Sequence, residues 1–149
     1  VEASAISPPE FLAHHPLPLE RGREGERERE REREMAEEGQ VISCHTVEAW
    51  EEQLKNANES KKLMVVDFTA SWCGPCRFIA PFLAELAKKL PQVIFVKVDV
   101  DELKQVASDW AIEAMPTFMF LRDGKIVDQV VGAKRDELQQ TVAKHLAAA

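Results

Sequence analysis

The strongest constraint on this sequence is the segment Trp72-Cys73-Gly74-Pro75-Cys76, which joins two stretches of different character. Residues 63–70 before it are almost continuously apolar, which is typical of a short strand buried on both faces. The residues after it carry apolar side chains at helical spacing. Two cysteines separated by two residues lie about one turn apart when a helix begins at the first of them. The spacing therefore permits a reversible disulfide.

The two cysteines should differ in reactivity. A cysteine is a nucleophile only as the thiolate, and the N-terminus of a helix stabilises that anion. Cys73 receives this stabilisation, whereas Cys76, one turn deeper, should be less exposed and less acidic. We expect Cys73 to attack a target disulfide and Cys76 then to attack Cys73, releasing the reduced target. Gly74 allows close approach of a partner backbone, Pro75 suits a first helical turn, and Trp72 forms an apolar rim.

Asp67 interrupts the apolar strand that precedes the two cysteines. A buried carboxylate costs free energy unless it is paired or protonated, so burial should raise its pKa. Asp67 is therefore a candidate proton acceptor for Cys76 in the resolving step. The alternative is that Asp67 pairs with Lys97 on the strand predicted beside it, and the two roles are compatible.

A second interpretation of the cysteine pair is half of a zinc site, with Cys44 and His45 as further ligands. Successive residues of a strand face opposite ways, which disfavours ligation by both. We predict no metal and no other cofactor. Cys44 is interpreted as a partly buried structural thiol, the alternative being a reactive thiol that forms an intermolecular disulfide or binds glutathione.

The remaining pattern predicts an α/β fold. Strands that alternate with helices imply a parallel core, and the turn pair Asp123-Gly124 signals a final antiparallel hairpin. We expect a central mixed five-stranded sheet flanked by four helices on its two faces. The expected strands are 41–44, 63–69, 93–99, 117–122 and 125–131, and the expected helices are 47–58, 73–90, 102–110 and 134–147.

Residues 1–34 differ from the rest, because Glu and Arg alternate strictly from Glu26 to Glu34. In a helix this repeat sets like charges four residues apart, although opposite charges three apart partly offset them, and there is nothing apolar to bury. We predict a disordered low-complexity extension over 1–34 and one folded domain over 35–149. We also hypothesise that Met35 is the natural initiator. A transit peptide, the alternative, is normally poor in acidic residues.

Composition restricts the partners. The net charge of -7 disfavours a nucleic-acid surface, which needs a basic patch. Three cysteines are too few for the disulfide framework of a small secreted domain, which favours a reducing compartment. No apolar run approaches the roughly 20 residues that cross a bilayer. We expect a cytoplasmic monomer that binds neither nucleic acid nor membrane.

One set of motifs resembles the thioredoxin family over residues 39–147: Asp67-Phe68, the segment 72–76, Pro81, Lys97, Met115-Pro116-Thr117 and Gly132-Ala133. Val65 to Asp67 together with Ala70-Ser71-Trp72 is similar to the plant h-type, cytosolic branch. The resemblance implies a thioredoxin fold for 35–149 and reduction of disulfides in target proteins. It also implies an NADPH-dependent thioredoxin reductase as the electron donor.

The same resemblance implies a cis Met115–Pro116 bond that faces the disulfide, with the backbone of Met115 pairing with an extended substrate strand. From the residues alone an ordinary trans bond is expected. Gly132 lies in the loop that completes the apolar rim.

Another class of function remains open, a redox-independent protein-binding or chaperone-like module that uses the rim of Trp72, Met115 and residues 131–133. A protein disulfide isomerase fits less well, because its domains usually carry a less reducing inner dipeptide and enter the secretory route.

Overall fold

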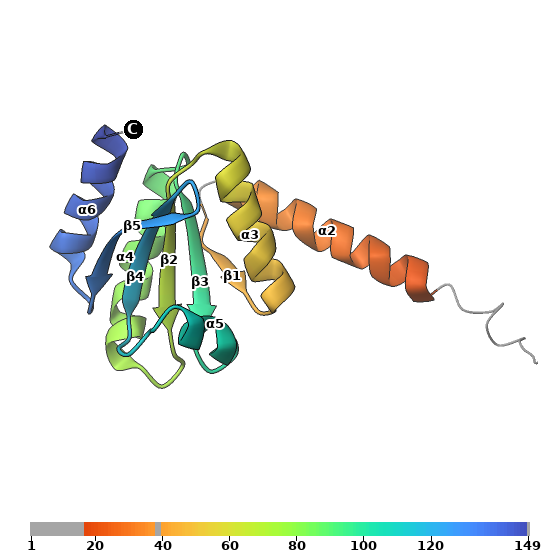
Figure 1. The fold of residues 1–149 in the computed structure, drawn as a ribbon, viewed down its shortest axis with the longest axis horizontal. Coiled ribbons are helices and arrows are strands. Elements are labelled where there is room, and N and C mark those ends of the chain that lie inside the picture. Colours follow the sequence, from red (N-terminus) through yellow and green to blue (C-terminus); the bar gives the residue numbers. More distant parts are fainter. Residues whose placement is uncertain (1–16, 38–39, 149) are drawn as a thin grey trace, which may run out of the picture. The chain divides into compact units, whose positions relative to one another are not determined.

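The computed structural model describes residues 17–37 and 40–148. Its centre is a five-stranded sheet in the order β1-β3-β2-β4-β5 (Figure 1). The strands are β1 Ile42–Cys44, β2 Met64–Thr69, β3 Ile94–Asp99, β4 Thr117–Arg122 and β5 Lys125–Val131. The helices are α2 Leu17–Glu37, α3 Val47–Ser60, α4 Gly74–Lys89, α5 Lys104–Asp109 and α6 Arg135–Ala147. The predicted mixed sheet with four helices around it, α3 to α6, is confirmed.

The central strand is β2, which pairs in parallel with β3 and antiparallel with β4. β1 extends the parallel part and β5 the antiparallel part. The β4–β5 connection is a two-residue turn in which Asp123 and Gly124 both have positive φ, 54° and 76°. A turn with this backbone conformation matches the twist of the paired strands, and Asp-Gly favours it. The hairpin predicted from the Asp-Gly pair is therefore confirmed.

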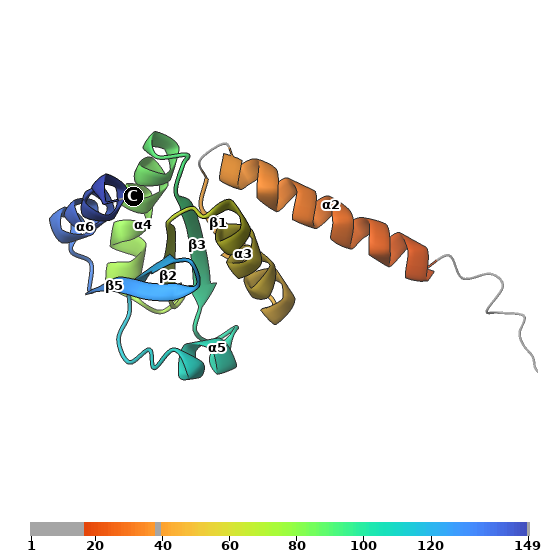
Figure 2. The same cartoon turned by 45° about the horizontal axis from the view of Figure 1, so that its top comes forward.

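Side chains of β2 alternate between two hydrophobic cores. Met64, Val66 and Phe68 pack on the side covered by α3 and α5. Phe68 lies there within a cluster of rings, 6.2 Å from Trp50 and 6.3 Å from Trp110 between centroids. Val65 packs on the opposite side, covered by α4 and α6, and Figure 2 shows the two helix layers on either side of the sheet. Alternation therefore turns Asp67 toward α4.

Helix α3 begins and ends at residues with capping geometry. Thr46 precedes α3, and its Oγ1 accepts a hydrogen bond from the backbone N–H of Ala49 at 3.1 Å. This bond satisfies one of the first-turn donors that have no partner within the helix. α3 ends at Lys61, whose φ of 57° lies in the left-handed region. No helix in the described part of the chain is long and apolar enough to cross a membrane.

The described part of the N-terminal region is helical, whereas the sequence predicted disorder through residue 34. The chain divides into two units, residues 1–33 and 34–149, and α2 occupies Leu17–Glu37. Glu and Arg are both strong helix formers, and their odd spacing also brings opposite charges together three residues apart, as in the Arg31–Glu28 pair at 3.4 Å. These effects outweigh the like charges four residues apart. Residues 1–16 lie outside the described residues.

Candidate active site

Cys73 and Cys76 lie at the junction of β2 and α4, as the spacing predicted. They form a disulfide with their Cα atoms 5.3 Å apart. Cys73 is the N-cap of α4, and its Sγ accepts a hydrogen bond from the backbone N–H of Cys76 at 3.2 Å. Pro75 lies in the first turn, where its missing N–H leaves no gap in the helix ladder. The helix N-terminus thus supplies a donor that would stabilise a thiolate on Cys73.

The difference between the cysteines lies in position more than in exposure. Cys73 is 5% exposed and Cys76 3% exposed, so both are buried in this oxidised form. The expected order of exposure holds, but the margin is small. The asymmetry rests on the cap, because only Cys73 has its sulfur at the N-terminal end of the helix.

Asp67 is buried on the α4 side of β2, with 1% of its surface exposed. Its Oδ1 has no hydrogen-bond partner among the residues that the structure describes. Burial raises the pKa of Asp67 from 3.8 to about 7, and the charge of Lys97 opposes this shift only in part. Lys97 is the neighbour of Asp67 in the β2–β3 register. The charge of Lys97 therefore lowers the pKa of Asp67 somewhat, while desolvation is the larger effect.

Two loops complete the surroundings of the disulfide. The Met115–Pro116 bond is cis, as the resemblance implies, so the trans bond expected from the residues alone is wrong. The carbonyl oxygen of Met115 lies 3.7 Å from Cys73 Sγ. The carbonyl oxygen of Pro116 accepts a hydrogen bond from the N–H of Gly132 at 2.8 Å. Gly132 has φ of 100°, a conformation that favours glycine. Residues 73, 115–116 and 132 thus form one connected region.

Trp72 lies on the surface beside the disulfide, with 64% of its area exposed. Its Nε1–H donates to Asp101 Oδ2 at 2.9 Å, and the N–H of Asp101 donates to Asp99 Oδ1 at 2.8 Å. Sequence reasoning missed Asp101. The signal was available in principle, because Asp101 follows the carboxyl end of β3, and the ends of the parallel strands β2 and β3 meet at one edge of the sheet.

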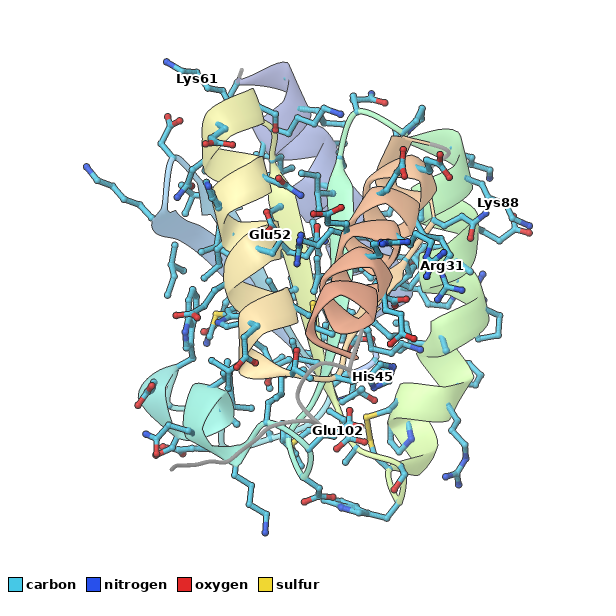
Figure 3. The ribbon with its side chains drawn as sticks, turned by 90° about the vertical axis from the view of Figure 1, so that its right-hand side faces the viewer. Arg31, His45, Glu52, Lys61, Lys88 and Glu102 are labelled. Carbon is cyan, nitrogen blue, oxygen red and sulfur yellow. A yellow bond between two sulfur atoms is a disulfide. The ribbon has the colours of Figure 1, made fainter. Side chains whose placement is uncertain are left out.

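The same edge carries a second polar contact, which Figure 3 shows between labelled side chains. His45 follows β1, and its Nδ1 lies 2.9 Å from Glu102 Oε1. Cys44, one residue earlier, is 1% exposed and packs in the core beneath α3. The two neighbours diverge as strand geometry requires, which supports the structural interpretation of Cys44. Within residues 17–37 and 40–148 no group of three or more His, Cys, Asp or Glu side chains is arranged to hold a metal ion.

Gly74 is exposed, and a Cβ added to it would meet no atom within 4 Å. The fold itself therefore does not require glycine at this position. Open space there agrees with the expectation that a partner backbone approaches the disulfide closely.

The amino-acid sequence was compared with protein families and with known proteins, and it is similar to one family. The sequence model of the family described as Thioredoxin matches residues 41–144. The chain is 80% identical to Thioredoxin H1 of Arabidopsis thaliana over 112 residues, which cover 75% of this chain and 98% of that protein. It is 78% identical to a Thioredoxin H-type of Ricinus communis over 114 residues, which cover 76% of this chain and 97% of that protein.

Solved structures show the same similarity. Thioredoxin NaTrxh from Nicotiana alata superposes with a TM-score of 0.70 at 45% identity, covering 72% of this chain and 93% of that one. A poplar thioredoxin h, PtTrxh4, superposes with a TM-score of 0.71 at 42% identity, covering 72% of this chain and 97% of that one.

Proposed function

The chain belongs to the thioredoxin family, in its plant h-type branch, and is a thiol–disulfide oxidoreductase acting on target proteins; from this premise we propose that Cys73 is the attacking thiol and Cys76 the resolving thiol. The observation that supports this order most directly is the hydrogen bond from the Cys76 N–H to Cys73 Sγ at the start of α4. An anion on Cys73 keeps that donor and lies at the positive end of the helix.

The reaction then runs in two exchanges. The Cys73 thiolate attacks one sulfur of the target disulfide, whose S–S bond breaks, and the departing sulfur leaves as a thiolate that takes up a proton. Cys76 loses its proton and attacks Cys73 Sγ in the mixed disulfide, which releases the second target sulfur as a thiolate. Two electrons pass to the target, and the protein is left with the Cys73–Cys76 disulfide seen in the structure.

We propose that Asp67 accepts the proton of Cys76 in the second exchange. A carboxyl with a pKa of about 7 can take up and release a proton near neutral pH, which a carboxyl of ordinary acidity does poorly. Lys97, beside Asp67 on β3, tunes this acidity and lies on the path of the proton. Two observations support this role: Asp67 shares the α4 side of β2 with Val65 by alternation, and α4 is the helix that carries Cys76.

The target-binding surface that we propose surrounds the disulfide. The contact of the Met115 carbonyl oxygen with Cys73 Sγ supports pairing of the Met115 backbone with an extended target segment. The proposed contact residues are Trp72, Gly74, Pro75, Met115, Pro116 and Gly132. An NADPH-dependent thioredoxin reductase would return the disulfide to the dithiol, in the cytoplasm and with the protein as a monomer. We expect binding to neither nucleic acid nor membrane, in agreement with the net charge of -7.

Reduction of insulin disulfides tests the activity directly. With dithiothreitol as the electron source, the wild-type protein should accelerate the precipitation of the insulin B chain, and NADPH with a thioredoxin reductase should replace dithiothreitol. If acceleration is undetectable with dithiothreitol, the proposed oxidoreductase mechanism fails. If it is seen only with dithiothreitol, the mechanism holds and the proposed electron donor is wrong.

A redox-independent binding module is favoured by one observation. Large apolar side chains lie exposed near the disulfide, with Trp72 at 64%, Phe78 at 66% and Val131 at 39%. Such side chains can hold a partner without electron exchange. The Cys73→Ser variant discriminates, because a binding module would retain its cellular role without the thiol.

We propose that residues 35–149 carry the active domain and that residues 1–34 are dispensable. The aligned 112 residues already cover 98% of the Arabidopsis relative, which supports this division. A chain that begins at Met35 should reduce insulin at a rate within about twofold of the full chain and unfold within about 2 °C of it. A larger loss of either would assign a role to α2.

A further inference from the structure

Arg77 makes a contact that the proposed exchange reactions do not use. Its Nη1–H donates to the backbone carbonyl oxygen of Ser71 at 2.7 Å. That distance is at the short end for N–H···O bonds, as is usual when the donor is charged. Side chains on a helix lean toward its N-terminus, so Arg77, the fourth residue of α4, reaches back past Cys73 to the segment before the helix.

That segment is a turn that carries the chain from β2 into the reactive cysteine. The Cys73 N–H donates to the carbonyl oxygen of Ala70 at 3.2 Å, which leaves Ser71 and Trp72 in the middle of the turn. The backbone N–H of Arg77 donates to the carbonyl oxygen of Cys73 at 3.3 Å. Arg77 thus holds the turn at two points, Cys73 through its backbone and Ser71 through its side chain.

A separate contact of the turn is the hydrogen bond that Trp72 Nε1–H donates to Asp101 Oδ2. Ser71, Trp72 and Arg77 are all exposed, so the hydrophobic core does not fix them. Two side-chain contacts, one with Arg77 of α4 and one with Asp101 after β3, therefore hold the turn in the absence of burial. Without the guanidinium, the turn would lose its side-chain contact at Ser71, while the Trp72 contact and the bonds of Cys73 would remain.

We propose that Arg77 is a positioning residue for the exchange reactions: by clamping the Ser71–Cys73 turn, it fixes the direction in which Cys73 presents its sulfur. This proposal rests on the proposed role of Cys73 as the attacking thiol. Thiol–disulfide exchange needs three sulfurs in line, first with the target and then with Cys76, so a wider range of Cys73 orientations lowers the rate of both steps.

The test compares Arg77→Met with Arg77→Lys and with the control Lys88→Met. Lys88 is an exposed cation in the last turn of the same helix, so its replacement removes the same charge at a distance from the turn. Arg77→Met should lower kcat/KM for insulin reduction about 3- to 10-fold and speed hydrogen exchange at the Cys73 amide by a similar factor. The Lys88→Met variant should change neither.

Arg77→Lys keeps the charge but has a shorter side chain without the guanidinium fork. Its kcat/KM and its Cys73 amide exchange rate should therefore lie between those of wild type and Arg77→Met. Melting temperatures within about 2 °C of wild type would show that the exposed contact does not carry the fold. A fall in kcat/KM with unchanged Cys73 exchange would overturn the proposal in favour of direct contact with targets. Faster exchange with unchanged kcat/KM, or no change in either, would also overturn it.

The amide-exchange readout is independent of the proposed function, because it is measured on the oxidised protein without turnover. Absence of insulin reduction by the wild type would defeat the exchange mechanism itself, whatever the Arg77 variants show. Normal wild-type activity with an inert Arg77→Met substitution would defeat only the positioning role.

Discussion

Replacing Cys73 by serine is expected to abolish disulfide reduction, with insulin reduction falling by about 10³-fold or more. A serine hydroxyl is not ionised near neutral pH, even at a helix N-terminus, and it cannot form a mixed disulfide. Insulin reduction with dithiothreitol measures the loss. Reduced wild-type protein is the proper reference for stability, because the variant also lacks the disulfide.

The matched control is Cys76→Ser. It keeps the attacking thiol, so it should also fail to turn over but should accumulate a mixed disulfide between Cys73 and the target, detectable on a non-reducing gel or by mass spectrometry. Accumulation on the Cys73→Ser variant instead would reverse the two roles. Retention of the cellular role by Cys73→Ser would favour the redox-independent binding module.

Replacing Asp67 by asparagine is expected to change how stability depends on pH. The pKa of Asp67 is about 7 in the folded protein against 3.8 ordinarily, so the folded state binds this proton more tightly than the unfolded state. Wild-type stability should therefore fall as the pH rises from about 4 to about 7, by on the order of 4 kcal/mol from this group, and level off above.

The Asp67→Asn variant has no such proton, so its free energy of unfolding should lack this decline and exceed that of the wild type at pH 8. Urea unfolding of the oxidised proteins at pH 4, 5, 7 and 8 gives the comparison. Equal pH slopes for the two proteins would show that Asp67 does not retain its proton in the fold.

The same substitution should slow the resolving step at neutral pH by about 10- to 100-fold, because Cys76 loses its proton acceptor. Raising the pH should recover part of the rate, since Cys76 then ionises without help. Asp128→Asn is the matched control. Asp128 lies on β5, and its hydrogen bond with His145 holds the pKa of that carboxyl below its usual range. A carboxyl of that acidity is a poor proton acceptor, so replacing Asp128 should leave the exchange rate unchanged. Equal slowing by both substitutions would rule out a specific role for Asp67.

Helical spacing of apolar side chains predicted the helices, whereas short, almost continuously apolar runs predicted the central strands. This pattern indicated that Asp67 lies on a strand buried on both faces. It could not show which face Asp67 occupies or which helix covers it, because the strand order β1-β3-β2-β4-β5 depends on pairings between distant segments. The sequence identified Asp67 as a buried acid, whereas the structure was needed to show that Oδ1 has no partner among the described residues.

The features that escaped prediction depend on contacts across loops. Residues 115 and 116 on their own favour a trans bond, and the cis bond followed only from resemblance to a family. Asp101 lies 29 positions from Trp72, and nothing in the local sequence of either residue points to the other. In α2 the alternation of Glu and Arg is visible in the local sequence, and the helix propensity of both residues outweighs the repulsion between like charges.

The two faces of the sheet carry different features of the molecule. Asp67, the helix that begins at Cys73 and the chain around it belong to one side, whereas the rings of Trp50, Phe68 and Trp110 pack on the other. The two sides meet at Val100, which packs against both the aromatic cluster and the cysteines. Repacking the rings away from Val100 would alter heat tolerance while leaving the electron-transfer side in place, so a lineage could adapt to a warmer habitat without retuning its redox chemistry.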